Sequence, residues 1–105
     1  MKNKILKIIR AKNKKKLVCL TAYSKPVAKI LDAHCDIILV GDSLATAMYG
    51  MKNTHKVNLE TMIRHGISVK SNVKKSLCVI DMPANTYNNT QQAKKNALLI
   101  FKKTK

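Results

Sequence analysis

The residues best suited to chemistry are two aspartates that each follow an apolar run. Asp42 ends the segment "IILVGD", and Asp81 ends the segment "LCVID". In parallel α/β folds, ligands bind at the carboxyl ends of the strands, and neighbouring strands lie about 4.8 Å apart. If these two strands are adjacent, both carboxylates reach one cation. Two carboxylates completed by waters and substrate oxygens are a usual way of holding Mg²⁺.

Other polar residues fall at the same expected edge of the sheet. Ser43 follows Asp42 directly, and Thr21 and Tyr23 end an earlier apolar run. A structural interpretation competes with the metal site, because an aspartate after a strand often caps the next turn. The chain has only five acidic residues, and this placement uses two of them. Spacing alone leaves both interpretations open and does not identify a reaction.

Three apolar runs and the segments between them must position these residues. The runs 17–23, 36–42 and 76–82 predict strands, and they are continuous rather than alternating, which is typical of a parallel sheet covered on its faces. Residues 43–57 lack periodicity and predict a loop. The expected helices are a short amphipathic helix over 2–10, a helix after Ser24 with Val27, Ile30 and Leu31 as its apolar stripe, a helix over about 59–73 capped by Asn58, and a last helix capped by Thr90.

This order predicts an α/β protein made of three strand–helix units. Such a chain forms either a small open sheet or the first part of a (βα)8 barrel, which needs roughly 250 residues. We expect one partial domain over residues 1–105, with an N-terminal helix over about 1–12 and the three βα units over about 17–105.

The net charge of +16 invites a nucleic-acid interpretation, which the composition weakens. All but two of the 21 basic residues are lysine, whereas arginine is preferred for bidentate base and phosphate contacts. The chain has one Phe, three Tyr and no Trp, so it offers little for bases to stack on. A Lys, Asn and Ile bias throughout the chain is also what an AT-rich genome produces.

Cysteine usage and hydropathy indicate a reduced, cytosolic protein. The cysteines are Cys19, Cys35 and Cys78, an odd number without C-x-x-C spacing, so no disulfide framework is expected. No apolar run approaches the roughly 20 residues of a membrane span. The start "MKNKILKIIR" is too charged for a secretory signal and lacks the Arg and Ser content of a transit peptide. The three histidines have no zinc spacing, and a solvated or structural role is expected for each.

Four motifs in this order resemble the ketopantoate hydroxymethyltransferase (3-methyl-2-oxobutanoate hydroxymethyltransferase) family. They are "TAYS" (21–24), "VGDSL" (40–44), "MIRH" (62–65) and "DMP" (81–83), within a similarity from about Leu17 to the C-terminus. The family pattern is T-A-Y-D, V-G-D-S-L, M-I-x-H and D-x-P. The combination of V-G-D-S-L with D-M-P at this separation is specific, although either motif alone is weak.

The resemblance implies a Mg²⁺-dependent (βα)8-barrel enzyme of pantothenate and coenzyme A synthesis. Such enzymes transfer a hydroxymethyl group from 5,10-methylenetetrahydrofolate to 3-methyl-2-oxobutanoate, and they assemble into rings of many subunits. By this analogy Asp42 and Asp81 hold the metal and, with Ser43, bind the substrate. Tyr23 and Gly41 line the same pocket. The expected partners are therefore small molecules, with neither membrane nor nucleic acid.

Departures from the family pattern limit this expectation. Ser24 and Ala45 replace an acid and a glycine of the motifs. The family's substrate-binding Lys, its further metal-associated Glu and its general base belong to later strands, so no residue here takes those roles. We therefore expect a partial member that is inactive alone. Two alternatives remain: a barrel of the phosphoenolpyruvate mutase and isocitrate lyase group, and a basic α/β module that binds RNA or an acidic partner.

Overall fold

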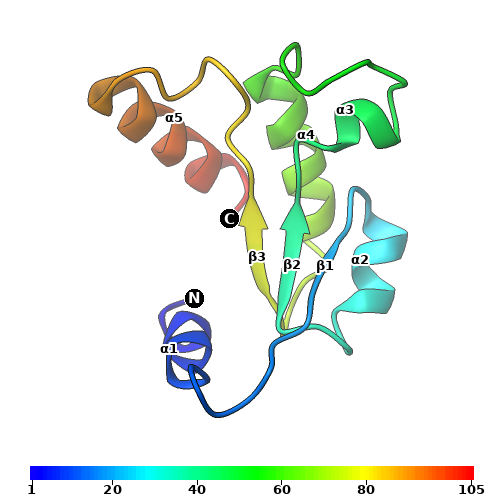
Figure 1. Cartoon of the computed structure of the whole chain (residues 1–105), viewed down its shortest axis with the longest axis vertical. Helices are drawn as coiled ribbons and strands as arrows, with labels where there is room; N and C mark the ends of the chain where they lie inside the picture. The colour runs from blue at the N-terminus through cyan, green and yellow to red at the C-terminus, as the bar shows by residue number, and fades with distance from the viewer.

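The computed structural model describes all 105 residues, and each of its three strands is followed by at least one helix. None of its helices combines the length and apolar character needed to cross a bilayer. The elements in chain order (Figure 1) are α1 (Lys2–Arg10), β1 (Cys19–Thr21), α2 (Lys25–Leu31), β2 (Ile37–Val40), α3 (Leu44–Ala47), α4 (Leu59–Lys70), β3 (Leu77–Ile80) and α5 (Thr90–Lys103).

The three strands form one parallel sheet in the order β1-β2-β3. Cys19 pairs with Ile37, and Ile37 in turn pairs with Leu77, so the strands start level with one another. The predicted α/β class and parallel sheet are confirmed. Each strand is shorter than its apolar run, because the flanking residues enter the turns that lead to the helices.

The helices that follow the three strands form a single layer on one side of the sheet. Helix α4 contacts both β2 and β3, and α2 and α5 flank α4 (Figure 1). A doubly wound sheet would instead carry helices on both faces. Consecutive parallel strands with all crossovers on one side are the arrangement of a (βα)8 barrel. With three strands the sheet stays open, and β1 and β3 are its edges.

The core lies between the sheet and α4. Ile38 and Val40 of β2 are fully buried against this helix, as are Met62 and Val69 on its inner face. Gly66 permits the close approach, because a Cβ at this position would lie 2.8 Å from the terminal methyl carbon of Ile80. Burying such large side chains stabilises the fold by about 1.5–3 kcal/mol each, so β2 and α4 are its centre.

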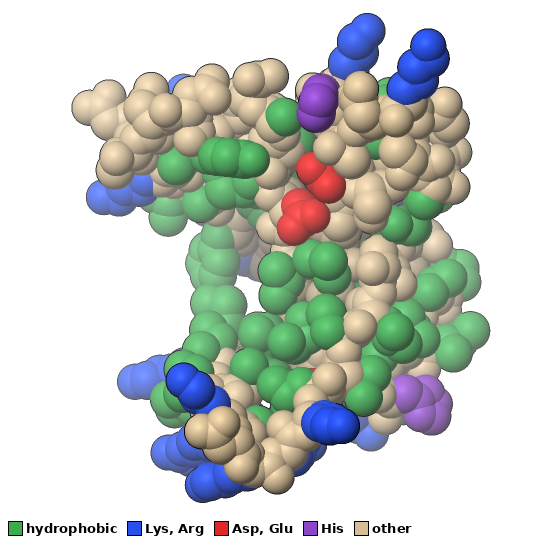
Figure 2. All heavy atoms as spheres, viewed as in Figure 1, with side chains coloured by type: hydrophobic (Ala, Val, Ile, Leu, Met, Phe, Trp, Pro, Cys, Tyr) green, Lys and Arg blue, Asp and Glu red, His purple; other side chains and the backbone are tan.

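The helices cover one face of the sheet, and parts of the sheet remain exposed. All three residues of β1 are exposed, and Val79 of β3 is 39% exposed. Figure 2 shows apolar side chains in the middle of the molecular face it presents. The continuous apolar runs correctly predicted parallel strands, but one helix layer covers only one side of them.

Several predicted boundaries and caps need correction. Residues 43–57, expected as a loop, contain the short helix α3, which follows directly from the turn after β2. Helix α4 ends at Lys70 rather than near residue 73. The cap of α5 is Asn89, whose side chain accepts a hydrogen bond from the Gln92 N–H, and not Thr90. Asn58 caps α4 as predicted, through the Thr61 N–H at 2.9 Å.

The predicted apolar stripe of helix α2 is only partly correct. Leu31 packs against the core and Ala28 is fully buried, whereas Val27 and Ile30 are exposed. The small Ala28 side chain allows α2 to lie close to α4. Ser24 occupies the N-cap position, but its side chain makes no capping hydrogen bond.

All three cysteines are free, and Cys19 is exposed although it lies within an apolar run of the sequence. It lies in β1, whose three residues are all exposed. A position within an apolar run therefore did not ensure burial at the sheet edge.

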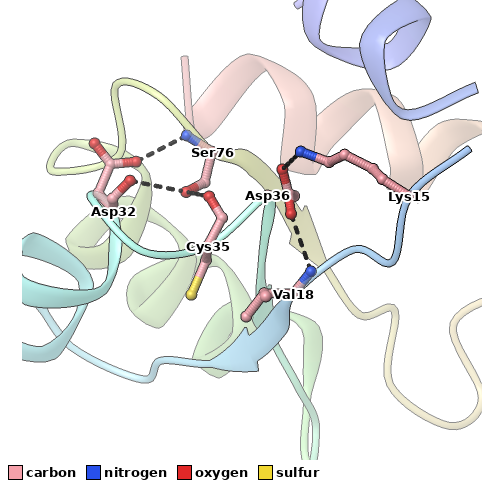
Figure 3. Close-up of polar contacts among 6 residues, drawn as sticks. All are labelled: Lys15, Val18, Asp32, Cys35, Asp36 and Ser76. Carbon is pink, nitrogen blue, oxygen red and sulfur yellow. Dashed lines mark hydrogen bonds and ion pairs between the residues drawn. The ribbon is translucent and has the colours of Figure 1, made fainter. Parts of the chain in front are cut away.

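Two carboxylates organise the amino end of the sheet (Figure 3). Asp32 accepts hydrogen bonds from the backbone N–H groups of Lys74, Lys75 and Ser76, which lead into β3. Burial raises the pKa of Asp32, but these N–H donors outweigh that effect and lower it to about 2. Asp36 accepts the N–H of Val18 at 3.0 Å, and this bond is the main reason for its lowered pKa. Both carboxylates therefore stabilise the fold.

Candidate active site at the carboxyl end of the sheet

Asp42 and Asp81 lie side by side at the carboxyl end of the sheet. Val40 and Ile80 are the last paired residues of β2 and β3, so the two aspartates follow adjacent strands. The backbone N–H of Asp42 donates to Oδ2 of Asp81 at 3.0 Å. Figure 2 shows two acidic side chains close together in this view, above its apolar centre. Sheet pairing thus brings together two carboxylates that are 39 positions apart.

Neither carboxylate is neutralised by a cationic side chain. The chain has a net charge of +16, yet its two salt bridges involve Asp36 and Glu60. Asp81 keeps Oδ1 available, because its hydrogen bond to the chain uses Oδ2, and the Asp42 carboxylate forms no hydrogen bond within the chain. Two adjacent carboxylates repel unless a cation or a proton lies between them. The oxygen donors therefore fit a hard divalent cation such as Mg²⁺.

The chain supplies only part of a complete coordination sphere. No group of three or more His, Cys, Asp or Glu side chains is close enough together to hold a metal ion. Mg²⁺ in proteins is usually bound through one or two carboxylates, with waters and substrate oxygens filling the other positions. An Asp42 and Asp81 pair corresponds to that pattern.

Gly41 leaves room for the Ser43 side chain in this turn. A Cβ at position 41 would lie 2.9 Å from Oγ of Ser43, so the hydroxyl would have to shift. The same Cβ would lie 3.5 Å from Oδ2 of Asp81, which is an ordinary van der Waals contact. The G-D-S sequence thus places the Asp42 carboxylate and the Ser43 hydroxyl in one turn, next to Asp81 of the neighbouring strand.

Ser43 and Tyr23 are also brought together. The Tyr23 hydroxyl lies 2.7 Å from Oγ of Ser43, a hydrogen bond that joins the turn after β1 to the turn after β2. All five residues expected to form the site therefore lie at one end of the sheet. Their roles towards metal and substrate stay predictions.

Sequence reasoning missed His65 of α4. Its Nδ1 atom lies 2.6 Å from the carbonyl oxygen of Tyr23, and its Nε2 atom lies 2.7 Å from the Tyr49 hydroxyl. The only signal in the sequence was the M-I-x-H motif, to which no role was attached. A contact between residues 42 positions apart cannot be read from local spacing.

A family model described as ketopantoate hydroxymethyltransferase matches residues 2–105. Three similar proteins carry the name 3-methyl-2-oxobutanoate hydroxymethyltransferase. The one from Pelagibacter ubique (strain HTCC1062) is 54% identical over 105 residues, covering 100% of this chain and 41% of its own length. Those from Anaplasma marginale (strain Florida) and Chelativorans sp. (strain BNC1) are 48% and 44% identical, covering 95% and 92% of this chain and 36% and 35% of their own lengths.

These relatives decide between the enzyme families that the sequence left open. The match favours this family over the phosphoenolpyruvate mutase and isocitrate lyase group. The chain spans about two-fifths of the length of the curated relatives it matches, in agreement with three strands of an eight-stranded barrel. The chain belongs to the ketopantoate hydroxymethyltransferase family.

Proposed function

We propose that this chain provides metal-binding residues and some of the substrate-binding residues of a ketopantoate hydroxymethyltransferase active site. The reaction is transfer of a hydroxymethyl group from 5,10-methylenetetrahydrofolate to 3-methyl-2-oxobutanoate. The observation that carries the proposal is the Asp42 and Asp81 pair, adjacent and without a cationic partner in a strongly basic chain. The reaction proposed for this pair is inferred from the family to which the chain belongs.

The two aspartates have distinct tasks in this proposal. The Asp42 N–H donates to Oδ2 of Asp81, so Oδ1 of Asp81 is the oxygen that would hold a metal. The Asp42 carboxylate, which makes no hydrogen bond within the chain, would hold the same ion. A Mg²⁺ ion held there would supply Lewis acidity towards the 2-oxo group of the substrate.

Ser43 and Tyr23 bind and orient the substrate carboxylate. With an anionic carboxylate in place, the Ser43 hydroxyl donates to it. The Tyr23 hydroxyl then donates to Oγ of Ser43 across their 2.7 Å contact. In this order of donors the Ser43 hydroxyl hydrogen is free to bind the substrate anion. Gly41 keeps the space above the turn free of a side chain.

The 105-residue chain by itself is expected to lack transferase activity. No residue in it is assigned as the general base that removes the substrate proton. Its sheet is also open at both edges, so water has access to the carboxylate pair. Assembly into rings of subunits stays a prediction from the family. No structural observation favours RNA as a partner.

The decisive experiment measures ligand-induced stabilisation. Mg²⁺ with 3-methyl-2-oxobutanoate should raise the melting temperature of the chain, since a ligand at about ten times its Kd stabilises the folded state by roughly 1.4 kcal/mol. Asp42→Asn should abolish this shift. Asp36→Asn is the matched control, because it changes a carboxylate at the opposite end of the sheet and should keep the shift. A shift that survives in Asp42→Asn would overturn the proposal.

A further inference from the structure

His65 of α4 forms hydrogen bonds with Tyr23 and Tyr49, and Tyr23 forms a further hydrogen bond with Ser43. Its Nδ1 atom lies 2.6 Å from the carbonyl oxygen of Tyr23, and its Nε2 atom lies 2.7 Å from the hydroxyl of Tyr49. The Tyr23 side chain continues to Oγ of Ser43 at 2.7 Å. A continuous chain of contacts therefore leads from Tyr49, after α3, through His65 and Tyr23 to Ser43 in the turn after β2.

The partners of His65 fix its tautomer. A carbonyl oxygen only accepts hydrogen bonds, so Nδ1 carries the proton that is donated to Tyr23. In the neutral ring Nε2 is then an acceptor, and the Tyr49 hydroxyl donates to it. The Tyr49 and His65 rings also meet edge to face, with centroids 5.8 Å apart and planes at 90°. Both ring nitrogens are therefore used, which holds the imidazole in one orientation.

The turn after β1 depends on this contact. Ladder pairing of β1 with β2 ends at Thr21, and the last hydrogen bond of this pairing joins the Ala22 N–H to the Leu39 carbonyl. The Tyr23 backbone makes no other hydrogen bond than the one to His65. Ser68, one turn further along α4, accepts the Lys25 N–H at 3.0 Å. Two side chains of α4 thus anchor the turn that carries the Tyr23 phenol.

We propose that His65 is a positioning residue for the Ser43 hydroxyl, acting through Tyr23. The inference deepens the proposed function and rests on it for the ligand, a 2-oxo acid whose carboxylate Ser43 binds. By fixing the Tyr23 carbonyl, His65 fixes the direction of the phenol. The phenol in turn holds Oγ of Ser43 with its O–H directed at the carboxylate. His65 itself touches neither metal nor substrate.

The first measurement needs no ligand. In the ¹⁵N–¹H spectrum of the imidazole, His65 should be the neutral tautomer with hydrogen on Nδ1. Tyr49→Phe removes the donor to Nε2 at an exposed position, so the variant should fold, keep the proton on Nδ1, which the Tyr23 carbonyl still accepts, and move the ¹⁵N shift of Nε2. A proton on Nε2 in the neutral ring, or an unmoved Nε2 shift in Tyr49→Phe, would overturn the assignment.

The second measurement separates positioning from folding. His65→Phe should weaken 3-methyl-2-oxobutanoate binding about fivefold, the equivalent of a hydrogen bond of about 1 kcal/mol, and leave the Kd for Mg²⁺ alone within about twofold. His65→Asn places an amide N–H near the position of Nδ1 and should restore most of the affinity. In a Ser43→Ala background, His65→Phe should have no further effect. Additive losses, or no rescue by asparagine, would refute a positioning role.

The two proposals fail in different ways. If the unchanged chain binds no 2-oxo acid with Mg²⁺, the proposed function fails, and the ligand part of this inference fails with it. The relay is then judged by the ¹³C shifts of Tyr23 Cζ and Ser43 Cβ without ligand. His65→Phe should move both signals, while Ser71→Ala at the C-cap of the same helix should move neither. Unmoved signals in His65→Phe would overturn the relay itself.

Discussion

Replacing Asp32 with alanine should destabilise the chain in a manner that depends on pH. The substitution removes the acceptor of three backbone N–H groups, from Lys74, Lys75 and Ser76, at distances of 2.8–3.1 Å. Burial raises the pKa of Asp32, but these donors bring it to about 2. The carboxyl of an unfolded chain has a pKa of about 3.9. Because the folded state has the lower pKa, the ionised carboxylate favours folding.

The magnitude follows from the difference between the two pKa values. A shift of this size corresponds to at most about 2.6 kcal/mol of unfolding free energy at neutral pH. The carboxylate is partly exposed, so solvent screening reduces our expectation to about 1.5 kcal/mol. The contribution is complete above about pH 5 and is lost as the pH falls through the folded pKa, with about half remaining at pH 3.

Urea unfolding at pH 7, 5 and 3, followed by far-ultraviolet circular dichroism because the chain has no Trp, measures this contribution. The free-energy difference between the unchanged chain and Asp32→Ala should halve between pH 5 and pH 3. Asp36→Ala is a matched control with one backbone donor instead of three, and its effect should be smaller. A difference below about 0.5 kcal/mol at pH 7, or one that is equally large at pH 3, would refute the reasoning.

Three further predictions, two of them with a control substitution, test the fold and the site. Gly41→Ala should weaken binding of Mg²⁺ with 3-methyl-2-oxobutanoate about tenfold in a calorimetric titration, because the added Cβ would lie 2.9 Å from Oγ of Ser43; unchanged binding would show that this turn tolerates a side chain. Asn89→Ala should lower the unfolding free energy by about 1 kcal/mol, and Thr90→Ala should have a clearly smaller effect, since only Asn89 caps α5; the opposite order would restore the original cap prediction. Ile38→Ala should cost about 3 kcal/mol in the same assay, whereas Ile30→Ala at 68% exposure should cost under about 0.5 kcal/mol; equal costs would contradict the described core.

Much of the fold could be predicted because it depends on local patterns. The apolar runs located all three strands, and the spacing of apolar residues located α1, α2, α4 and α5. Errors arose where a neighbour in space decided the outcome. The burial of Ala28 in place of Ile30 depends on how α2 meets α4, and the exposure of β1 depends on its place at the sheet edge.

The candidate site likewise has features that the sequence predicts and features that depend on tertiary structure. The residues at the strand ends could be named from the sequence, since a carboxylate after a buried strand needs a partner of some kind. The hydrogen bond from the Asp42 N–H to Asp81 and the space kept by Gly41 depend on the register of two strands. For His65 the sequence predicted only a solvated or structural role, because nothing near it in the sequence indicates its contact with Tyr23.

The sequence by itself determined the residue types that end each strand, the alternation of strands and helices, and the family to which these motifs belong. Tertiary structure alone decided which strand ends are neighbours, which helix faces are buried, and which side chain of α4 holds the turn after β1. The physical reason is the range of the interactions. Periodicity and capping act over a few residues, whereas the Asp42–Asp81 and Tyr23–His65 contacts join positions 39 and 42 apart, and form only once the sheet and α4 have packed.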